Sequence, residues 1–305
     1  MRIHAPAITY FDAVRRARSI REAARRLNVA SSAVNRQILK LEQEIGAPLF
    51  ERLPSGLKLT AAGEALARHV IVVMQDLERA RQDIEALRGA RAGHITVATV
   101  EGVCGEILPE VIGRMRQRSS SVTVTAITMG SFAIPRAVIE GEADIGLAFG
   151  LRRSGDLQQV AHGRFRLGAI VKPDHPLAKR KTVKMSACLD YPLILATPDL
   201  SINVLLEPVV SRLVRMPEPA VTSSSVELMR ELAAQGIGIA FQTRIGLARP
   251  LADGALVHIP LEAGGPVWSD LGVYVRAGRS IPSAMASFLR LIADSIASRE
   301  AAENR

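Results

Sequence analysis

The segment Ser31–Glu42, SSAVNRQILKLE, combines a narrow apolar stripe with an unusual polar side. Val34, Ile38 and Leu41 follow one another at the spacing of one face of an α-helix. The opposite side carries hydroxyls, an amide and cations, which come from Ser31, Ser32, Asn35, Arg36 and Lys40. Such side chains exchange hydrogen bonds with base edges and bind phosphates. The segment is therefore a candidate helix for reading nucleic acid.

The residues before this segment predict two further short helices. The first covers about residues 5–17, and the second begins at Ser19, which has capping-box spacing to Glu22. Only residues 28–30 separate the second helix from the reading helix, which leaves room for a tight turn between angled helices. The alanines at 23–24 permit close packing there. Together these features predict a helix-turn-helix, whose second helix enters the major groove of DNA.

A hairpin is expected directly after the three helices. The run LFERLPSGLKLT, residues 49–60, places two short alternating stretches around Pro-Ser-Gly, a turn signal. Such a hairpin forms the wing of a winged helix-turn-helix, and it places Arg52 and Lys58 near phosphates. Leu39 also falls on the outward side of the reading helix, where it either meets a thymine methyl group or packs on the wing.

The charge of the chain is concentrated at this end. The net charge is +9, and residues 1–60 contain 11 Lys or Arg against 5 Asp or Glu, whereas the other 245 residues contain 28 against 25. A basic module on a nearly neutral body is typical of a polyanion-binding domain joined to something else, although a basic surface kept for solubility is the alternative. We find neither a transmembrane stretch nor a signal peptide, so no membrane partner and a cytoplasmic location are expected.

Catalytic and metal-binding patterns are not found in the sequence. The two cysteines, Cys104 and Cys188, are expected to be buried small side chains, with a redox-sensing pair as the alternative. The six histidines (4, 69, 94, 162, 175, 258) have no ligand-like spacing, and no catalytic or phosphate-loop motif is present. We therefore expect no cofactor, no metal and no enzymatic activity.

Residues 66–87 repeat with a period of seven. The apolar positions are Leu66, Val70, Val73, Leu77, Ala80, Ile84 and Leu87, at spacings that alternate between four and three. This pattern predicts a long helix, with Thr60 as its N-cap, that pairs with the same helix of another subunit. A helix that packs on its own domain is the alternative. The helix is expected to end at residues 89–93, a candidate hinge.

The pattern changes at residue 94 to alternating strands and helices. Strands are predicted at 94–100, 122–128 and 143–149, which with helices near 104–118 and 131–141 form a parallel βαβαβ unit. A second set is predicted at 166–172, 192–196, 219–225, 236–242 and 255–260, with helices near 201–215 and 225–235. A strand at 270–276 and a helix from about residue 283 complete the chain, so we expect two α/β lobes.

A cleft between two such lobes is a natural small-molecule site, because ligands collect beyond the carboxyl ends of the strands. We expect the following residues to bind an effector there: Thr99, Val100, Glu101, Gly102, Ser131, Thr197, Ser201, Ser223 and Ser224. Hydroxyls and free amides suit an oxyanion, whereas Glu101 favours a cationic or hydroxylated ligand. Each Ser or Thr taken alone is also a possible helix cap.

The run AARRLNVASSAVNRQILKLEQEIGAPLFER, followed by LT-x-AG at residues 59–63, resembles the N-terminal signature of LysR-type transcriptional regulators. The resemblance implies an α/β protein with an N-terminal all-α winged helix-turn-helix over 1–60 and a long dimerising linker helix over 61–92. It also implies a two-lobed effector domain over 93–305 that is similar to periplasmic binding proteins. Lobe I would span about 93–165 and 268–305, and lobe II about 166–267.

The function implied by this resemblance is sequence-specific DNA binding that a small-molecule effector modulates. The expected partners are double-stranded DNA, the effector, a second copy in a homodimer or homotetramer, and RNA polymerase. The alternative is a small-molecule-binding or enzymatic α/β protein with an incidental basic helical extension. Binding to duplex DNA that weakens steeply with salt distinguishes the two hypotheses.

Overall fold

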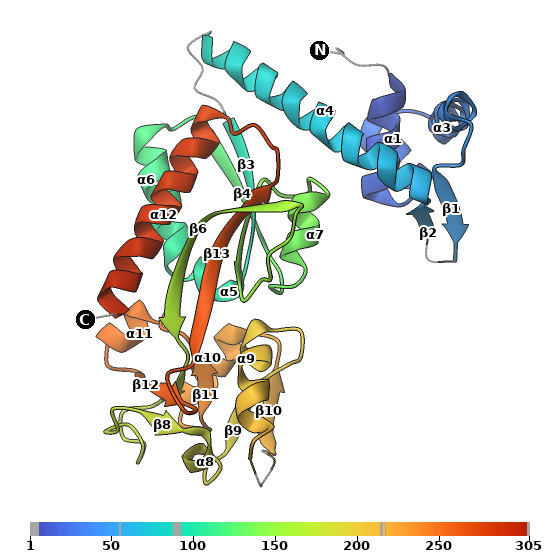
Figure 1. Cartoon of the computed structure of the whole chain (residues 1–305). Helices are drawn as coiled ribbons and strands as arrows, with labels where there is room; N and C mark the ends of the chain where they lie inside the picture. Colours follow the sequence, from blue (N-terminus) through green and yellow to red (C-terminus); the bar gives the residue numbers. More distant parts are fainter. Residues whose placement is uncertain (1–5, 55, 88–92, 214–215, 217, 304–305) are drawn as a thin grey trace. The chain divides into compact units, whose positions relative to one another are not determined.

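Figure 1 presents the computed structural model, which describes residues 6–54, 56–87, 93–213, 216 and 218–303. The chain divides into two compact units, one formed mainly by residues 1–88 and the other by most of residues 89–305. No helix in these described ranges is long and apolar enough to span a membrane.

The N-terminal unit contains three helices, a hairpin and one long helix. These elements are α1 (Pro6–Ala17), α2 (Ile20–Leu27), α3 (Ser31–Ile45), β1 (Phe50–Leu53), β2 (Gly56–Leu59) and α4 (Ala61–Leu87). Its core consists of fully buried side chains from all three short helices, including Phe11, Ala23 and Val34. Val29, in the turn between α2 and α3, packs against this core. The order and the bounds are those of a winged helix-turn-helix.

The ends of α2 follow the signals in its sequence, with one difference. The hydroxyl of Ser19 accepts a hydrogen bond from the Glu22 amide at 3.4 Å, as the capping box predicts. The Glu22 carboxylate instead pairs with Arg25 and Arg26 on the same helix, so only half of the box forms. Asn28 ends the helix in the left-handed region at φ 54°, a conformation that Asn tolerates better than most residues.

A carboxylate joins the reading helix to the hairpin. Oε1 of Glu42, near the end of α3, accepts hydrogen bonds from the amides of Leu49 at 2.7 Å and Phe50 at 3.3 Å. Thr60 then caps α4 by accepting from the Gly63 amide at 3.0 Å. A Cβ at Gly63 would lie 2.1 Å from the carbonyl oxygen of Leu49, so only glycine fits there. These contacts explain the Leu41-Glu42 and LT-x-AG motifs in physical terms.

Helix α4 begins on the core of the N-terminal unit. Val70 is fully buried in that core and Leu66 packs against it, so these two seam positions are filled within one protomer. Val73 and Leu77 are partly buried, and Ile84 is 40% exposed. The side chain of Leu87 and residues 89–92 of the hinge predicted at 89–93 lie outside the described residues, and Gly93 begins the first strand of the second unit. Of the described seam positions, this core leaves Val73, Leu77, Ala80 and Ile84 for a partner helix.

Lobe I of the second unit is built on a five-stranded sheet in the order β4-β3-β5-β13-β6. Its strands are β3 (Gly93–Thr99), β4 (Val122–Thr128), β5 (Ile145–Phe149), β6 (Leu157–Arg166) and β13 (Trp268–Arg276). Strand β3 is parallel to β4 and β5, which confirms the predicted βαβαβ unit. The helices are α5 (Glu101–Cys104), α6 (Ile107–Arg118), α7 (Ile134–Ile139) and α12 (Ser283–Glu303). Helices α6 and α12 cover one face of the sheet and α7 covers the other (Figure 1).

Strand β6 was not predicted as a separate element. The sequence analysis placed one strand at 166–172, whereas the structure ends β6 at Arg166 and begins β7 at Gly168. Strand β6 is antiparallel to β13 at one edge of the sheet. Its sequence, LQQVAHGRFR, is largely polar because several of its side chains face solvent, so it gives no apolar run. The short elements β8 (Val183–Lys184), α8 (Met185–Cys188) and α11 (Ala248–Ala252) were not predicted either.

Lobe II contains the remaining strands and helices. The sheet order β11-β7-β12-β8 joins β7 (Gly168–Val171), β8 (Val183–Lys184), β11 (Ala240–Gln242) and β12 (Val257–Glu262). The parallel pair β9 (Leu193–Ala196) and β10 (Pro219–Ser223) adjoins it through a bridge between Leu193 and Ile239. The helices are α8 (Met185–Cys188), α9 (Ser201–Val210), α10 (Val226–Ala234) and α11 (Ala248–Ala252). The two chain crossings between lobes lie side by side, since the Leu167 amide donates to the Val267 carbonyl at 2.8 Å.

We expect a half-buried histidine, His258 in β12, to make the stability of lobe II depend on pH. Burial lowers the pKa of His258 to about 4, and Nε2 of the neutral ring donates to the Gln242 carbonyl at 3.0 Å. The ordinary pKa of about 6.5 applies to the unfolded chain, so this contribution is complete above pH 6.5 and is lost as the pH falls toward 4.

We expect the free energy of unfolding to fall by up to about 3 kcal/mol through this group between pH 6.5 and 4. Urea unfolding at several pH values measures it. The His258→Gln variant keeps a donor for the Gln242 carbonyl but does not titrate, so its pH dependence should be shallower. If the free energy of unfolding of both proteins depended equally on pH, His258 would not be the group responsible.

Candidate functional site

The outward face of α3 carries the predicted DNA-reading side chains. Ser31, Ser32, Arg36 and Lys40 are exposed, and Asn35 is partly buried on the flank. The N-cap residue that precedes the helix is Ala30, whose methyl side chain cannot accept a hydrogen bond, so α3 has no side-chain N-cap hydrogen bond. Open amides and the positive end of the helix dipole bind phosphate. The amino end of α3 is thus suited to the backbone of a nucleic acid.

The cations near this face are weakly engaged within the protein. Among the described residues, no ion pair involves Arg36 or Arg52. Lys40 lies 3.7 Å from Glu44 and Lys58 lies 3.6 Å from Glu51, and all four side chains are well exposed. Exposed ion pairs contribute at most about 1 kcal/mol, so a phosphate can replace the carboxylate of Glu44 or Glu51 as the partner of the lysine.

Leu39 resolves one of the alternatives left open by the sequence. Its side chain is 56% exposed, so it does not pack on the wing of its own chain. Contact with a thymine methyl group remains the prediction for this residue.

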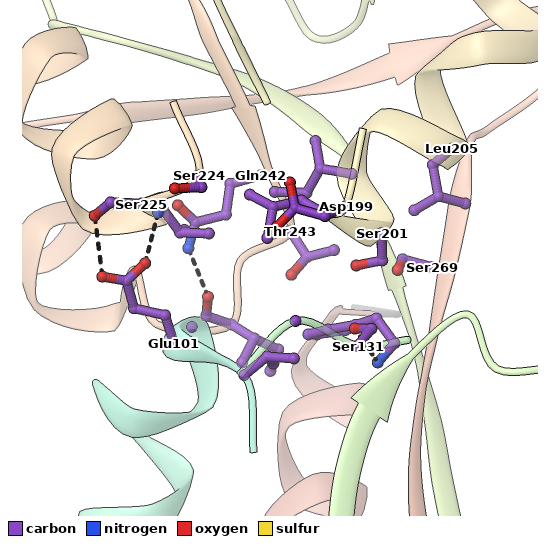
Figure 2. Close-up of a pocket in the computed structure, with 18 of the residues that line it drawn as sticks. Glu101, Ser131, Asp199, Ser201, Leu205, Ser224, Ser225, Gln242, Thr243 and Ser269 are labelled. Carbon is purple, nitrogen blue, oxygen red and sulfur yellow. Dashed lines mark hydrogen bonds between the residues drawn. The ribbon is translucent and has the colours of Figure 1, made fainter. Parts of the chain in front are cut away.

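A cavity of about 370 Å³ lies between the two lobes of the second unit. The predicted effector-binding residues lie in four segments, 99–102, 130–131, 197–201 and 223–225, and each segment contributes to the cavity wall (Figure 2). Of the predicted effector-binding residues, those that line the cavity are Val100, Glu101, Gly102, Ser131, Ser201 and Ser224. The volume and the mixed apolar and polar wall fit a small organic molecule.

Three predicted residues do not line the cavity. Thr99, the last residue of β3, is fully buried, and the hydroxyls of Thr99 and Thr197 are buried without a hydrogen-bond partner among the described residues. Ser223 accepts a hydrogen bond from the Ser225 amide at 3.0 Å and so shapes the turn before α10. For these three residues, strand alternation and local turn geometry direct the side chain away from the cleft.

Several lining residues lie outside the four predicted segments. The polar ones are Thr128, Gln242, Thr243 and Ser269, and the apolar ones include Met129, Phe149, Leu167, Leu205 and Ile245. Asp199 and Ser225 lie within the predicted segments, although they were not singled out. Thr243 and Ser269 are both buried. Thr243 directly follows β11, and Ser269 is the second residue of β13, next to the chain crossing at Val267. Ser225 precedes a predicted helix, so the sequence offered a signal for it. Residues such as Gln242 and Ser269 reach the cleft from strand ends, and no local pattern in the sequence marks them.

Glu101 crosses the cleft and binds the amino end of α10. Its carboxylate accepts hydrogen bonds from the Val226 amide at 2.6 Å and from the Ser225 hydroxyl at 3.1 Å (Figure 2). Glu106 makes a second contact between lobes by accepting from the Gly246 amide at 2.9 Å, while its other oxygen pairs with Arg299. The charge of Glu101 is therefore partly compensated by the helix end, and its effect on the charge of a ligand stays a prediction.

Two serines at the cavity have structural partners. The hydroxyl of Ser131 accepts a hydrogen bond from the Phe149 amide at 3.2 Å and is almost fully buried. Ser225 caps α10 by accepting from the Leu228 amide at 3.1 Å. The Ser131 hydroxyl keeps its proton to donate to a ligand, whereas the Ser225 hydroxyl already donates its proton to Glu101.

The two cysteines lie in different lobes. Burial raises the pKa of the Cys188 thiol in α8 to about 12, so it is not a reactive thiolate. Cys104, in α5, is partly buried, and both thiols are free. Within the described ranges, no cluster of three His, Cys, Asp or Glu could hold a metal ion.

Family models match both units of the chain. Residues 6–64 match the model of the bacterial regulatory helix-turn-helix protein, lysR family, and residues 88–297 match the LysR substrate binding domain. Together these models cover most of the chain.

Relatives and solved structures agree with that assignment. An uncharacterized HTH-type transcriptional regulator of Escherichia coli strain K12, YdcI, is 25% identical over 283 residues, which cover 90% of this chain and 89% of YdcI. Full-length OxyR C199D from Pseudomonas aeruginosa is similar in fold, with a TM-score of 0.71, 19% identity and coverage of 95% of this chain and 93% of that one. The effector binding domain of QuiR in complex with shikimate matches 68% of this chain and 98% of its own length, with a TM-score of 0.57 and 15% identity.

The contact between Glu101 and α10 predicts a loss of stability in the Glu101→Gln variant. Removing the charge weakens a hydrogen bond to a helix amino end, so we expect the free energy of unfolding to fall by about 1–2 kcal/mol. Urea unfolding at neutral pH measures the change. Glu218→Gln, at an exposed carboxylate, is the control and should unfold like the parent protein. Equal stability of all three proteins would show that the lobes do not depend on this contact.

Proposed function

Because the chain belongs to the LysR family of bacterial transcriptional regulators, which are not enzymes, we propose that its α3 reads the major groove and that its cavity binds the effector. One observation carries the proposal. The exposed polar face of α3, with its uncapped amino end, belongs to the same chain as an inter-lobe cavity sized for a small molecule.

DNA recognition is proposed to divide between two sets of residues. Asn35 and Arg36 lie on the second turn of α3, where side chains reach base edges in a helix-turn-helix. Ser31, Ser32 and the amino end of α3 suit phosphates, as do Lys40 and the wing residues Arg52 and Lys58. Leu39 adds an apolar contact for a thymine methyl group.

We also propose that the regulator acts as a homodimer or homotetramer through α4. Of the described seam positions, Val73, Leu77, Ala80 and Ile84 remain for a partner helix, and they keep the spacing of a coiled-coil seam. A dimer holds two α3 helices at a fixed separation, which suits a DNA site with two half-sites.

We propose that the two lobes can adopt two arrangements and that the effector binds one arrangement more tightly than the other. A ligand shifts such an equilibrium only through different affinities for the two states. The similar fold of QuiR in complex with shikimate supports a small-molecule effector for this cavity. We propose that the regulator works in the cytoplasm, where the DNA is, and that the shift changes its contact with RNA polymerase.

The Arg36→Ala variant tests the DNA-reading role. Losing a contact to a base or a phosphate should weaken binding to the duplex upstream of its own gene by about 1–3 kcal/mol or relax its sequence preference. Gel-shift titration against specific and random duplexes measures both effects.

Arg249→Ala is the matched control for Arg36→Ala, because it removes an exposed arginine from the effector unit. It should bind DNA like the parent protein. If Arg36→Ala bound as tightly and as selectively as that control, α3 would not be the reading helix.

The Leu77→Lys variant tests the dimer. A lysine in the apolar seam should dissociate the oligomer, because burying an unpaired charge between helices is unfavourable. Sedimentation velocity measures the oligomeric state. Asp76→Lys adds a lysine to the same helix outside the seam and should leave the oligomer intact. An unchanged oligomer with Leu77→Lys would exclude the α4 seam as the interface.

A further inference from the structure

The inter-lobe cavity carries an unbalanced set of charges. Its wall includes the carboxylates of Glu101 and Asp199, and none of its lining residues is a lysine, arginine or histidine. A half-enclosed cavity concentrates the field of such charges. The ligand therefore meets a negative environment.

Glu101 does not account for this environment, because its charge is compensated. Its carboxylate accepts from the Val226 amide and the Ser225 hydroxyl, so the amino end of α10 is occupied from within. The amino end of α10 is thus closed to an anionic ligand.

Asp199 is the carboxylate that remains for a ligand. It precedes α9 in lobe II, and among the described residues no ion pair or hydrogen bond involves its side chain. Its Oδ2 lies 3.9 Å from the position that a Cβ on Gly130 of lobe I would occupy. The carboxylate therefore faces the opposite lobe across the cavity wall (Figure 2).

Gln242 adds a buried acceptor without a partner. Its Nε2 donates to the Ile245 carbonyl at 2.9 Å, and since a carbonyl only accepts, this bond fixes which end of the amide is the oxygen. The side chain is only 5% exposed, and its Oε1 has no hydrogen-bond partner in the described part of the protein. Buried acceptors are normally satisfied, so this oxygen lacks a donor that a ligand can supply.

We propose, resting on the function proposed above, that the effector carries a protonated amino group bound by the Asp199 carboxylate and Gln242 Oε1. An ammonium group offers three donors and a positive charge, which match one free carboxylate and one unpaired carbonyl oxygen. The apolar wall formed by Met129, Phe149 and Leu205 contacts the carbon skeleton. A simple carboxylate would meet Asp199 with no basic side chain to bind it.

The test uses the full-length protein and compounds grouped by charge. Thermal shift and calorimetric titration at neutral pH compare amines (putrescine, agmatine, tyramine), amino acids (lysine, phenylalanine), neutral polyols (inositol) and carboxylates (benzoate, shikimate). We expect binding only from compounds with a protonated amine. Asp199→Asn should weaken the tightest of these by about tenfold or more.

Asp253→Asn is the matched control, because Asp253 is an exposed carboxylate next to α11 that does not line the cavity. It should leave amine binding unchanged. Binding of carboxylates in preference to amines, amine affinity that survives Asp199→Asn, or no binding by any amine would each overturn the inference. Gel shifts with the same preparations distinguish the amine proposal from the proposed function. A carboxylate that alters DNA binding would refute the proposal that the effector is an amine, while the proposed function as an effector-responsive regulator would stand.

Discussion

A carboxylate that accepts hydrogen bonds across the cleft joins the two lobes of the effector unit beside the cavity. The carboxylate of Glu101, in the first turn after β3 of lobe I, binds the amino end of α10 in lobe II. A helix end offers unpaired amides and a positive dipole, so a carboxylate from the facing lobe satisfies both. A second hydrogen bond between the lobes runs from the Gly246 amide to the Glu106 carboxylate. A ligand that changes the distance between the lobes would weaken or strengthen these bonds.

The same chemistry stabilises the DNA-binding unit on a smaller scale. Glu42 extends from the reading helix and accepts from the first amides of the wing, which fixes helix and hairpin as one body. Gly63 allows α4 to approach the Leu49 carbonyl, where any side chain would clash. Recognition therefore depends on a rigid scaffold beneath α3 and not on the exposed residues alone. The signature residues of the family are, in this chain, mostly the ones that build this scaffold.

The sequence predicted those parts whose signals are local. Caps, the hairpin turn and the apolar stripe of Val34 and Ile38 specify the helix-turn-helix within sixty residues. The cavity was predicted only in part, because its wall combines segments far apart in the chain. Glycine and serine signals marked Gly102 and Ser201, but nothing near Gln242 in the sequence reveals that it crosses to the cleft. Thr99 was misplaced because strand alternation turns it away from the cavity. The heptad pattern was likewise ambiguous, since Val70 fits a dimer seam and an internal core equally well.

The amino end of the chain thus provides a surface for DNA, and the effector unit provides a cavity whose closure depends on a few carboxylate contacts. The claim that these form a DNA-binding regulator is tested most directly by the salt dependence of duplex binding by the full-length protein. With Lys40, Arg52, Lys58 and the amino end of α3 contributed by two subunits, about six to eight phosphate contacts are expected. Fluorescence anisotropy should then give a plot of log affinity against log salt with a slope of about −5 to −7. A slope near zero, or no binding to any duplex at low salt, would contradict it.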